Sequence, residues 1–171
     1  SYLIVRQDST DVTSIANLEG SVFAYADPYS NTGYLAPRYE IRQLGRDPAS
    51  FFRKTFFTWS HRKVVEAVAS GLARGGAVDS YIWETLAHVE PALAKRTRVV
   101  SRSPDYGFPP FVAHRSVSQG DFQLMQSHLL GTAGTERGRK LLARLYLDGF
   151  TTGSPRIYDS VAQMMRAFGE S

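Results

Sequence analysis

The chain has 171 residues, of which 43% are hydrophobic, and a formal net charge of +4 with a pI near 9.5. This length and hydrophobic content are enough to bury a core, which favours one globular domain or two small lobes and excludes a disordered or fibrous chain. Cysteine is absent, which excludes disulfides, thiol nucleophiles and cysteine metal sites, and we predict neither a metal nor a cofactor.

The positive charge comes mainly from arginine, with 16 Arg against four Lys, and it is scattered along the chain. Arginine suits phosphate and carboxylate partners, but without a basic patch we do not predict nucleic acid as a partner. The longest apolar runs are far shorter than the roughly 20 residues that span a bilayer, and residues 1–15 do not read as a signal peptide. The opening "SYLIVRQDS" reads as a strand without an initiating Met, so we expect a segment to precede it.

Residues 1–103 alternate between strand-like and helix-like patterns. Strands are predicted over residues 2–5, 21–26, 54–58, 76–79 and 97–103. Helices are predicted over residues 31–44, 60–70 and 80–89. Alternation of this kind indicates βαβ units, so we predict an α/β fold with a mostly parallel sheet flanked by helices.

The turn-rich "SPDYGFPP" at residues 103–110 places a predicted boundary near residue 104. We therefore expect an α/β lobe over residues 1–103 and a mainly helical segment over 104–171, with one more strand at 111–117. The last helix is predicted to start with Ser154 as N-cap and Pro155 in its first turn. Its apolar stripe and two earlier ones are interpreted as core: Phe122, Met125, Leu129, Leu141, Leu142, Leu145, Ile157, Val161, Met164, Met165 and Phe168.

Three strand-to-helix junctions carry the candidate site. In the first, "DPYSNTG", the side chains of Ser30, Asn31 and Thr32 offer donors, and Gly33 lets a bound group approach the backbone. The others are "FTWSHRK" and "AVDSY". Helices that begin at the carboxyl edge of a parallel sheet point unpaired N–H groups at this edge, so we predict an anion site there.

The second junction breaks a local rule. Ser60 is a suitable N-cap, yet His61, Arg62 and Lys63 fill the first turn, where the helix dipole already places partial positive charge. Such local conflicts tend to mark function. We predict that His61 binds the anion and that Arg62 and Lys63 point into solvent.

Asp79, at the third junction, has two possible roles that the sequence leaves open. It can cap the helix that follows, or it can accept a hydrogen bond from an acidic hydroxyl or an amine of the ligand.

Four segments resemble the phosphate/phosphite/phosphonate substrate-binding family of ABC transporters. They are "LEGSVFAYADPYSNTGYLAPRYE", "FFTWSHRKVVEAVASGLARGGAVDSYIWE", "RVVSRSPDYGFPPFVA" and "LYLDGF". The resemblance implies a periplasmic-binding-protein fold whose two lobes close on a phosphorus oxyanion, a membrane permease as partner, and a periplasmic or otherwise extracytoplasmic location. It also implies that residues 1–103 form the second lobe and that residues 104–171 are the returning part of the first.

Mapped by motif, the resemblance assigns the oxyanion to Ser30, Asn31, Thr32 and His61, and the acidic position to Asp79 or, less securely, Asp105. Gly33 and Ser60 are secondary candidates from the junctions themselves. Family members usually carry Thr or Ser at the position of Asn31, which predicts a different hydrogen-bond pattern. They are also longer at the N-terminus, so this chain alone would hold half a cleft, bind weakly and expose apolar surface that a homodimer could cover.

Two other classes of function remain open. A ligand-sensing domain of a regulator or receptor would share this fold and this ligand chemistry. An enzyme acting on phosphorylated substrates is disfavoured, because the sequence shows no nucleophile with a base and an orienting group, and His61, His88, His114 and His128 lie in unrelated contexts. We therefore predict a binding protein without catalytic residues.

Overall fold

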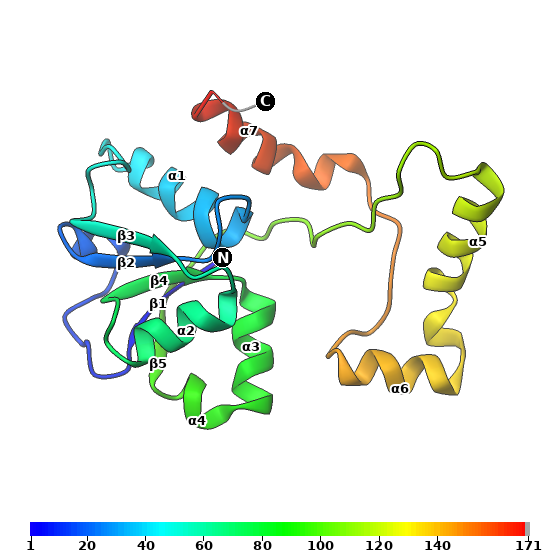
Figure 1. The fold of residues 1–171 in the computed structure, drawn as a ribbon, viewed down its shortest axis with the longest axis horizontal. Coiled ribbons are helices and arrows are strands. Elements are labelled where there is room, and N and C mark those ends of the chain that lie inside the picture. Colours follow the sequence, from blue (N-terminus) through cyan, green and yellow to red (C-terminus); the bar gives the residue numbers. More distant parts are fainter. Residues whose placement is uncertain (170–171) are drawn as a thin grey trace. The chain divides into compact units, whose positions relative to one another are not determined.

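A five-stranded sheet with strand order β3-β2-β4-β1-β5 forms the centre of the computed structural model, which describes residues 1–169 (Figure 1). The strands are β1 (Tyr2–Arg6), β2 (Val22–Tyr25), β3 (Lys54–Phe57), β4 (Gly75–Val78) and β5 (Thr97–Arg102). β2 pairs in parallel with β3 and β4, whereas β1 is antiparallel to β4 and β5. The predicted α/β sheet is confirmed, with β1 as the reversed strand.

Helices connect the strands at both faces of the sheet. They are η1 (Ile15–Leu18), η2 (Asn31–Leu35), α1 (Ala36–Gln43), α2 (His61–Ala69), α3 (Ser80–Val89) and α4 (Pro91–Ala94). The helix predicted over residues 31–44 starts as one π-helical turn, η2, and continues as α1, which ends before Gly45 at φ 71°. π-Helical turns occur often at functional sites.

Two apolar layers hold the helices to the sheet, because successive strand residues face opposite sides. α2 and α3 cover one face of the sheet and α1 the other (Figure 1). Ile4 belongs to the layer under α2 and α3, whereas Leu3 and Val5 belong to the layer under α1 and η1. Gly76 lets α2 approach β4 closely, since a Cβ at this position would lie 2.5 Å from Cγ1 of Val64. This close packing fixes the position of α2 relative to β4.

The chain divides into two compact units, each described by itself. The first comprises residues 1–105 and 160–169, including most of α7 (Asp159–Ala167), and here the guanidinium of Arg38 lies 4.2 Å from the ring centre of Phe168. The second unit spans Tyr106–Asp159, with helices α5 (Gln119–Leu130), η3 (Thr132–Gly134), α6 (Glu136–Arg144) and η4 (Pro155–Tyr158). The assignment of residues 1–103 and 104–171 to two lobes stays a prediction.

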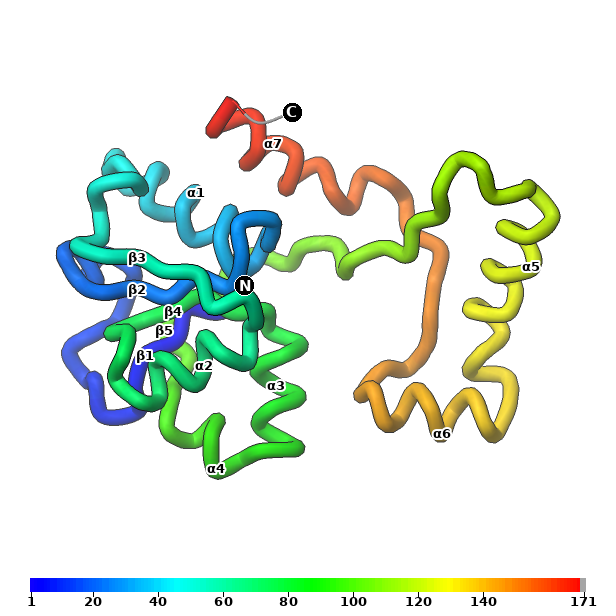
Figure 2. The backbone as a smooth tube through the Cα atoms, in the orientation of Figure 1, coloured from blue at the N-terminus to red at the C-terminus, as the bar shows by residue number. Residues whose placement is uncertain are grey.

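Within the second unit, the hydroxyl of Tyr158 donates to the carbonyl oxygen of Phe108 at 2.9 Å. Ser154 accepts from the N–H of Arg156, as predicted for an N-cap, and Pro155 begins η4. The strand predicted over residues 111–117 is wrong: the trace leaves β5 and reaches α5 without entering another strand or helix (Figure 2). An apolar run becomes a strand only where a neighbouring strand pairs with it.

The core interpretation of the C-terminal stripes is also wrong for five of their eleven residues. Leu142 and Met164 are buried, at 3% exposure each. Five others expose between 40% and 56% of their surface: Phe122, Met125, Leu141, Leu145 and Ile157. Helical periodicity shows which apolar residues share one face of a helix, but it does not show whether another part of the protein packs against this face.

Over the described residues, no helix combines the length and apolar character needed to cross a membrane.

Candidate functional site

The carboxyl ends of three neighbouring parallel strands place the predicted site residues together. β2 lies between β3 and β4, so the turns that leave these strands meet at one edge of the sheet. Oγ of Ser30, after β2, lies 3.4 Å from Nε2 of His61, after β3. The backbone N–H of Asp79, after β4, donates to Nδ1 of His61 at 3.1 Å. His61 thus joins all three junctions.

The junction after β2 presents several hydrogen-bond donors that no protein group within residues 1–169 uses. Ser30 caps η2, because its Oγ accepts the N–H of Gly33 at 2.9 Å, and the hydrogen of its hydroxyl stays available. The backbone N–H groups of Asn31 and Thr32 have no hydrogen-bond partner within residues 1–169, as is usual for the first turn of a helix. The hydroxyl of Thr32 is engaged, since it donates to Oδ2 of Asp79 at 3.1 Å.

Gly33 is buried between Ala26, Ser30 and His61. A Cβ at this position would lie 2.4 Å from Cβ of Ala26, 2.9 Å from Cε1 of His61 and 3.1 Å from Oγ of Ser30. Distances below 3.0 Å are not tolerated by real Cβ atoms, so a side chain here would displace its neighbours. Gly33 therefore supports the position of the His61 ring as well as the shape of the turn.

The hydrogen bonds of His61 fix its tautomer. Nδ1 accepts from the N–H of Asp79, so in the neutral ring the proton lies on Nε2. Burial lowers the pKa of His61 below 6.5, although the carboxylates of Asp79 and Asp27 act in the opposite direction. The 3.4 Å separation from Ser30 is long for a hydrogen bond, which leaves the Nε2–H group free to donate to another acceptor.

Asp79 performs the capping role that the sequence left open. Its Oδ1 accepts the N–H of Tyr81 at 2.9 Å, which caps α3, while Oδ2 accepts from Thr32. The carboxylate therefore ties the first junction to the third. Any additional contact between Asp79 and a ligand stays a prediction.

Ser60 occupies the N-cap position of α2, but the prediction that its side chain caps the helix is wrong. The side chain makes no capping hydrogen bond. A different bond forms at this turn, since the hydroxyl of Thr58 donates to the Ser60 carbonyl oxygen at 2.9 Å. Oγ of Ser60 thus has no structural duty at the helix start.

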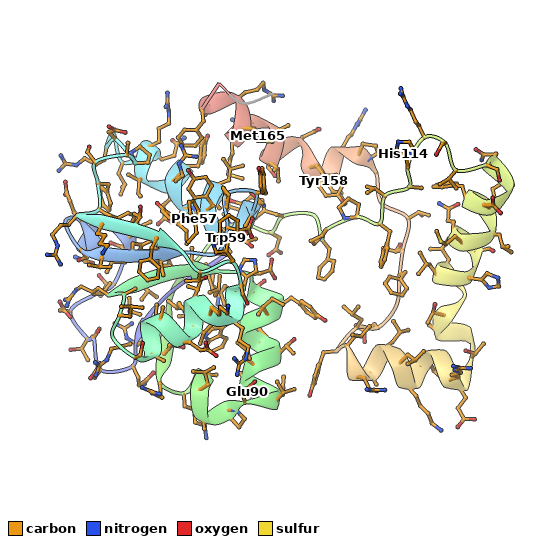
Figure 3. The ribbon with its side chains drawn as sticks, in the orientation of Figure 1. Phe57, Trp59, Glu90, His114, Tyr158 and Met165 are labelled. Atoms are coloured by element: carbon orange, nitrogen blue, oxygen red, sulfur yellow. The ribbon has the colours of Figure 1, made fainter. Side chains whose placement is uncertain are left out.

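Arg62 and Lys63 are exposed, as predicted. Arg62 forms ion pairs with Glu66 and, at 2.7 Å, with Glu90. Glu90 lies at the C-terminal end of α3 (Figure 3). The two carboxylates compensate the unfavourable position of this cation in the first turn of α2. The charge conflict seen in the sequence is thereby resolved for Arg62 without a ligand.

Two of the predicted site residues, Asp105 and Asn31, make no side-chain hydrogen bond to the other predicted site residues. Asp105 is exposed and forms no hydrogen bond with the residues of the three junctions. Asn31 is partly exposed, yet its Oδ1 atom is buried and has no hydrogen-bond partner among the described residues. Across the same residues, no group of three or more His, Asp or Glu side chains is arranged to hold a metal ion.

Trp59 is a residue near the site that the sequence analysis missed. It has a left-handed backbone with φ 61°, which costs a bulky residue about 1–3 kcal/mol. Its N–H donates to the carbonyl oxygen of Ala26 at 2.6 Å, and its ring, 68% exposed, lies 6.0 Å from the ring of Phe57 (Figure 3). No pattern predicts a left-handed tryptophan, because Gly and Asn are the residues expected there.

Solved structures with the same fold are available for comparison. A binding protein component of an ABC phosphonate transporter from Pseudomonas aeruginosa superposes with a TM-score of 0.85 at 24% identity, covering 95% of this chain and 55% of that one. PhnD1 from Prochlorococcus marinus, in complex with methylphosphonate, gives 0.80 at 19% identity, covering 99% and 66%. A Xanthomonas citri protein bound to ATP gives 0.69 at 22% identity, covering 99% and 66%.

These similarities establish the fold, and this chain spans between 55% and 66% of the length of those three proteins. A search of curated proteins gives no match. The family model described as "ABC transporter, phosphonate, periplasmic substrate-binding protein" matches residues 1–158. The chain therefore belongs to the phosphonate-binding family of periplasmic substrate-binding proteins of ABC transporters.

Proposed function

We propose that this chain binds a small phosphorus oxyanion, a phosphonate, phosphite or phosphate, as part of the solute-binding component of an ABC importer. The observation that carries the proposal is the convergence of Ser30, His61 and Asp79 from three neighbouring strand ends. The free donors there are the Ser30 hydroxyl, the Nε2–H of His61 and the backbone N–H groups of Asn31 and Thr32. Donors of this kind, at the start of a helix, suit an anion.

Binding without chemical conversion is part of the proposal. Ser30, His61 and Asp79 superficially resemble a catalytic triad, in which a carboxylate accepts from Nδ1–H and the Nε2 lone pair deprotonates the serine. Here the relation is reversed, because Nδ1 of His61 is the acceptor and the backbone N–H of Asp79 is the donor. Nε2 then holds the proton, so this histidine is arranged to donate to an anion and not to activate Ser30.

The partner and location follow from family membership as proposals. We infer that the chain delivers its ligand to an ABC transporter permease and works in the periplasm or another extracytoplasmic space, which cell fractionation would test. A ligand-sensing domain of a regulator would use the same site, but no finding favours it.

Association between copies is a further part of the proposal. Large apolar side chains stay exposed in the second unit, among them Phe111 at 75% and Val112 at 86%. Exposed apolar surface of this kind marks interaction sites. We expect a second copy to cover it, so sedimentation equilibrium should give a mass that rises with concentration towards twice 19.0 kDa; a constant monomer mass would contradict the pairing.

The ligand proposal is tested by NMR titration, which detects weak as well as tight binding. Phosphate, phosphite, methylphosphonate and an aminophosphonate are each added to the 15N-labelled chain, and at least one should shift the amide signals of Asn31 and Thr32 to saturation. Ser30→Ala should raise the Kd at least about tenfold, because a hydrogen bond to a charged group contributes about 1.5–3 kcal/mol.

A matched control separates the loss of a ligand contact from the loss of a cap. Ser118 caps α5 by accepting the N–H of Asp121 at 3.1 Å, as Ser30 caps η2, but it lies in the other unit. Ser118→Ala should leave the Kd unchanged while lowering stability by about 1 kcal/mol, as expected for a lost cap. If none of the four anions shifted the Asn31 and Thr32 signals to saturation, the proposed function would be wrong.

A further inference from the structure

The charge around the candidate site is not that of a site for a doubly charged anion. The carboxylates of Asp79 and Asp27 both raise the pKa of His61, so two negative charges already lie close to the site. Arg62 is paired with Glu66 and Glu90, and no Lys or Arg side chain within the described residues donates to Ser30, Thr32, His61 or Asp79. The donors of the site are neutral, so a second negative charge on the ligand would be uncompensated.

One acceptor in the site lacks a donor. Oδ1 of Asn31 is buried without a partner, which is uncommon, because nearly all buried polar atoms in folded proteins are hydrogen-bonded. The flanking residues, Ser30 and Thr32, both contact the other junctions through their side chains. The two oxygens of Asp79 already accept from Tyr81 and Thr32. Asn31 therefore offers a buried acceptor that no donor within residues 1–169 uses.

We propose that the site selects a singly charged oxyanion that retains one hydroxyl, such as an alkylphosphonate monoanion, and that this P–O–H group donates to Oδ1 of Asn31. This inference rests on the proposed function and narrows its ligand class. The neutral donors at Ser30, His61 and the start of η2 hold the charged oxygens. A neutral amide suits the hydroxyl, since it accepts a hydrogen bond without repelling the anion as a further carboxylate would.

A comparison of methylphosphonate with methanesulfonate tests the hydrogen bond between the P–O–H group and Oδ1 of Asn31. Between its two ionisations, methylphosphonate has one negative charge and one hydroxyl, whereas methanesulfonate has the same charge and similar shape but no hydroxyl. In NMR titrations at such a pH, the chain should bind methylphosphonate about tenfold or more tightly, because the sulfonate leaves Oδ1 of Asn31 unpaired.

Asn31→Leu removes the acceptor at nearly constant size, and it should reduce the preference to less than about threefold while leaving the thermal transition unchanged or higher. Asn17→Leu is the matched control. Oδ1 of Asn17 accepts from Thr13 and Ser14, so this variant should lose stability but retain the full preference for methylphosphonate.

The outcomes separate this inference from the function on which it rests. If the chain bound methylphosphonate and the Asn31→Leu variant kept the same preference, the inference would be overturned and the function upheld. A preference for methanesulfonate in the unmodified chain would also overturn it, because the amide would then present its NH2 group to the ligand. Failure to bind either ligand would count against the proposed function.

Discussion

Gly33→Ala is expected to weaken anion binding at least about tenfold and to destabilise the fold by about 1–3 kcal/mol, as overpacking of a closely packed site does. The added Cβ would lie 2.4 Å from Cβ of Ala26 and 2.9 Å from Cε1 of His61. Ala26 cannot yield readily, because its Cβ is attached directly to the backbone next to β2. The His61 ring and the Ser30 hydroxyl must therefore move, and both are proposed ligand donors.

Urea denaturation measures the change in stability and NMR titration with methylphosphonate measures the change in Kd. Gly120→Ala is the control for the substitution itself, because a Cβ on Gly120 would meet only Oγ of Ser118, at an ordinary 3.9 Å. This control should be stabilising by about 0.4–1 kcal/mol, through the reduced freedom of the unfolded chain, and should not change the Kd. Unaltered binding by the Gly33 variant would show that His61 and Ser30 do not need their present positions.

Two substitutions of His61 should separate its two hydrogen bonds. Asparagine can place a carbonyl oxygen near the position of Nδ1 and keep the bond from the N–H of Asp79, but it cannot reach the position of Nε2. Glutamine reaches the position of Nε2 and leaves the Asp79 N–H unpaired. We expect His61→Asn to raise the Kd about tenfold or more, and His61→Gln to lower the free energy of unfolding by about 1–3 kcal/mol with a smaller effect on binding.

The same residue should make stability depend on pH. Burial is the main cause that lowers the pKa of His61 below 6.5, against the carboxylates of Asp79 and Asp27 and with a small contribution from the amino group of Ser1. The unfolded chain therefore takes up a proton more readily than the folded chain, and this contribution to the free energy of unfolding falls as the pH drops below 6.5 towards the lower folded pKa.

Thermal unfolding of the original chain and of both variants between neutral and mildly acidic pH measures this loss. It should be smaller in His61→Asn and His61→Gln, and unchanged in the control His128→Gln, whose side chain is exposed. An identical pH profile in all four proteins would show that His61 does not titrate with folding.

Most of the first unit could be predicted because local signals and burial agree there. The sequence predicts one helix face from Val64, Val65, Val68 and Leu72, and the three valines are fully buried against the sheet. Leu72 is the exception, because it lies beyond the end of α2 and is 65% exposed. The strand-to-helix junctions also follow from the sequence, since parallel strands bring their ends to one edge. The reversed direction of β1 could not be predicted, because a five-residue buried run has no signal for the polarity of its partners.

The candidate site, too, could be predicted only in part. The proximity of Ser30 and His61 could be predicted, because polar residues at strand ends are local features that can be read directly from the sequence. It did not identify the hydrogen bonds at this edge: the Ser60 side chain does not cap α2, and Nδ1 of His61 accepts from the backbone N–H of Asp79. The exposure of Phe122 and Met125 was also unpredictable, since it depends on what surrounds a helix and not on its periodicity.

The position of β1 sets the order in which the sheet can be completed. Residues 2–6 are translated before β4 and β5, yet they lie between these two strands, whose residues come more than 60 positions later. Contacts so distant in sequence require closure of a long loop and tend to slow folding. During synthesis on the ribosome, β1 must therefore remain without its neighbours until β4 and β5 have emerged, and only then can the sheet become continuous.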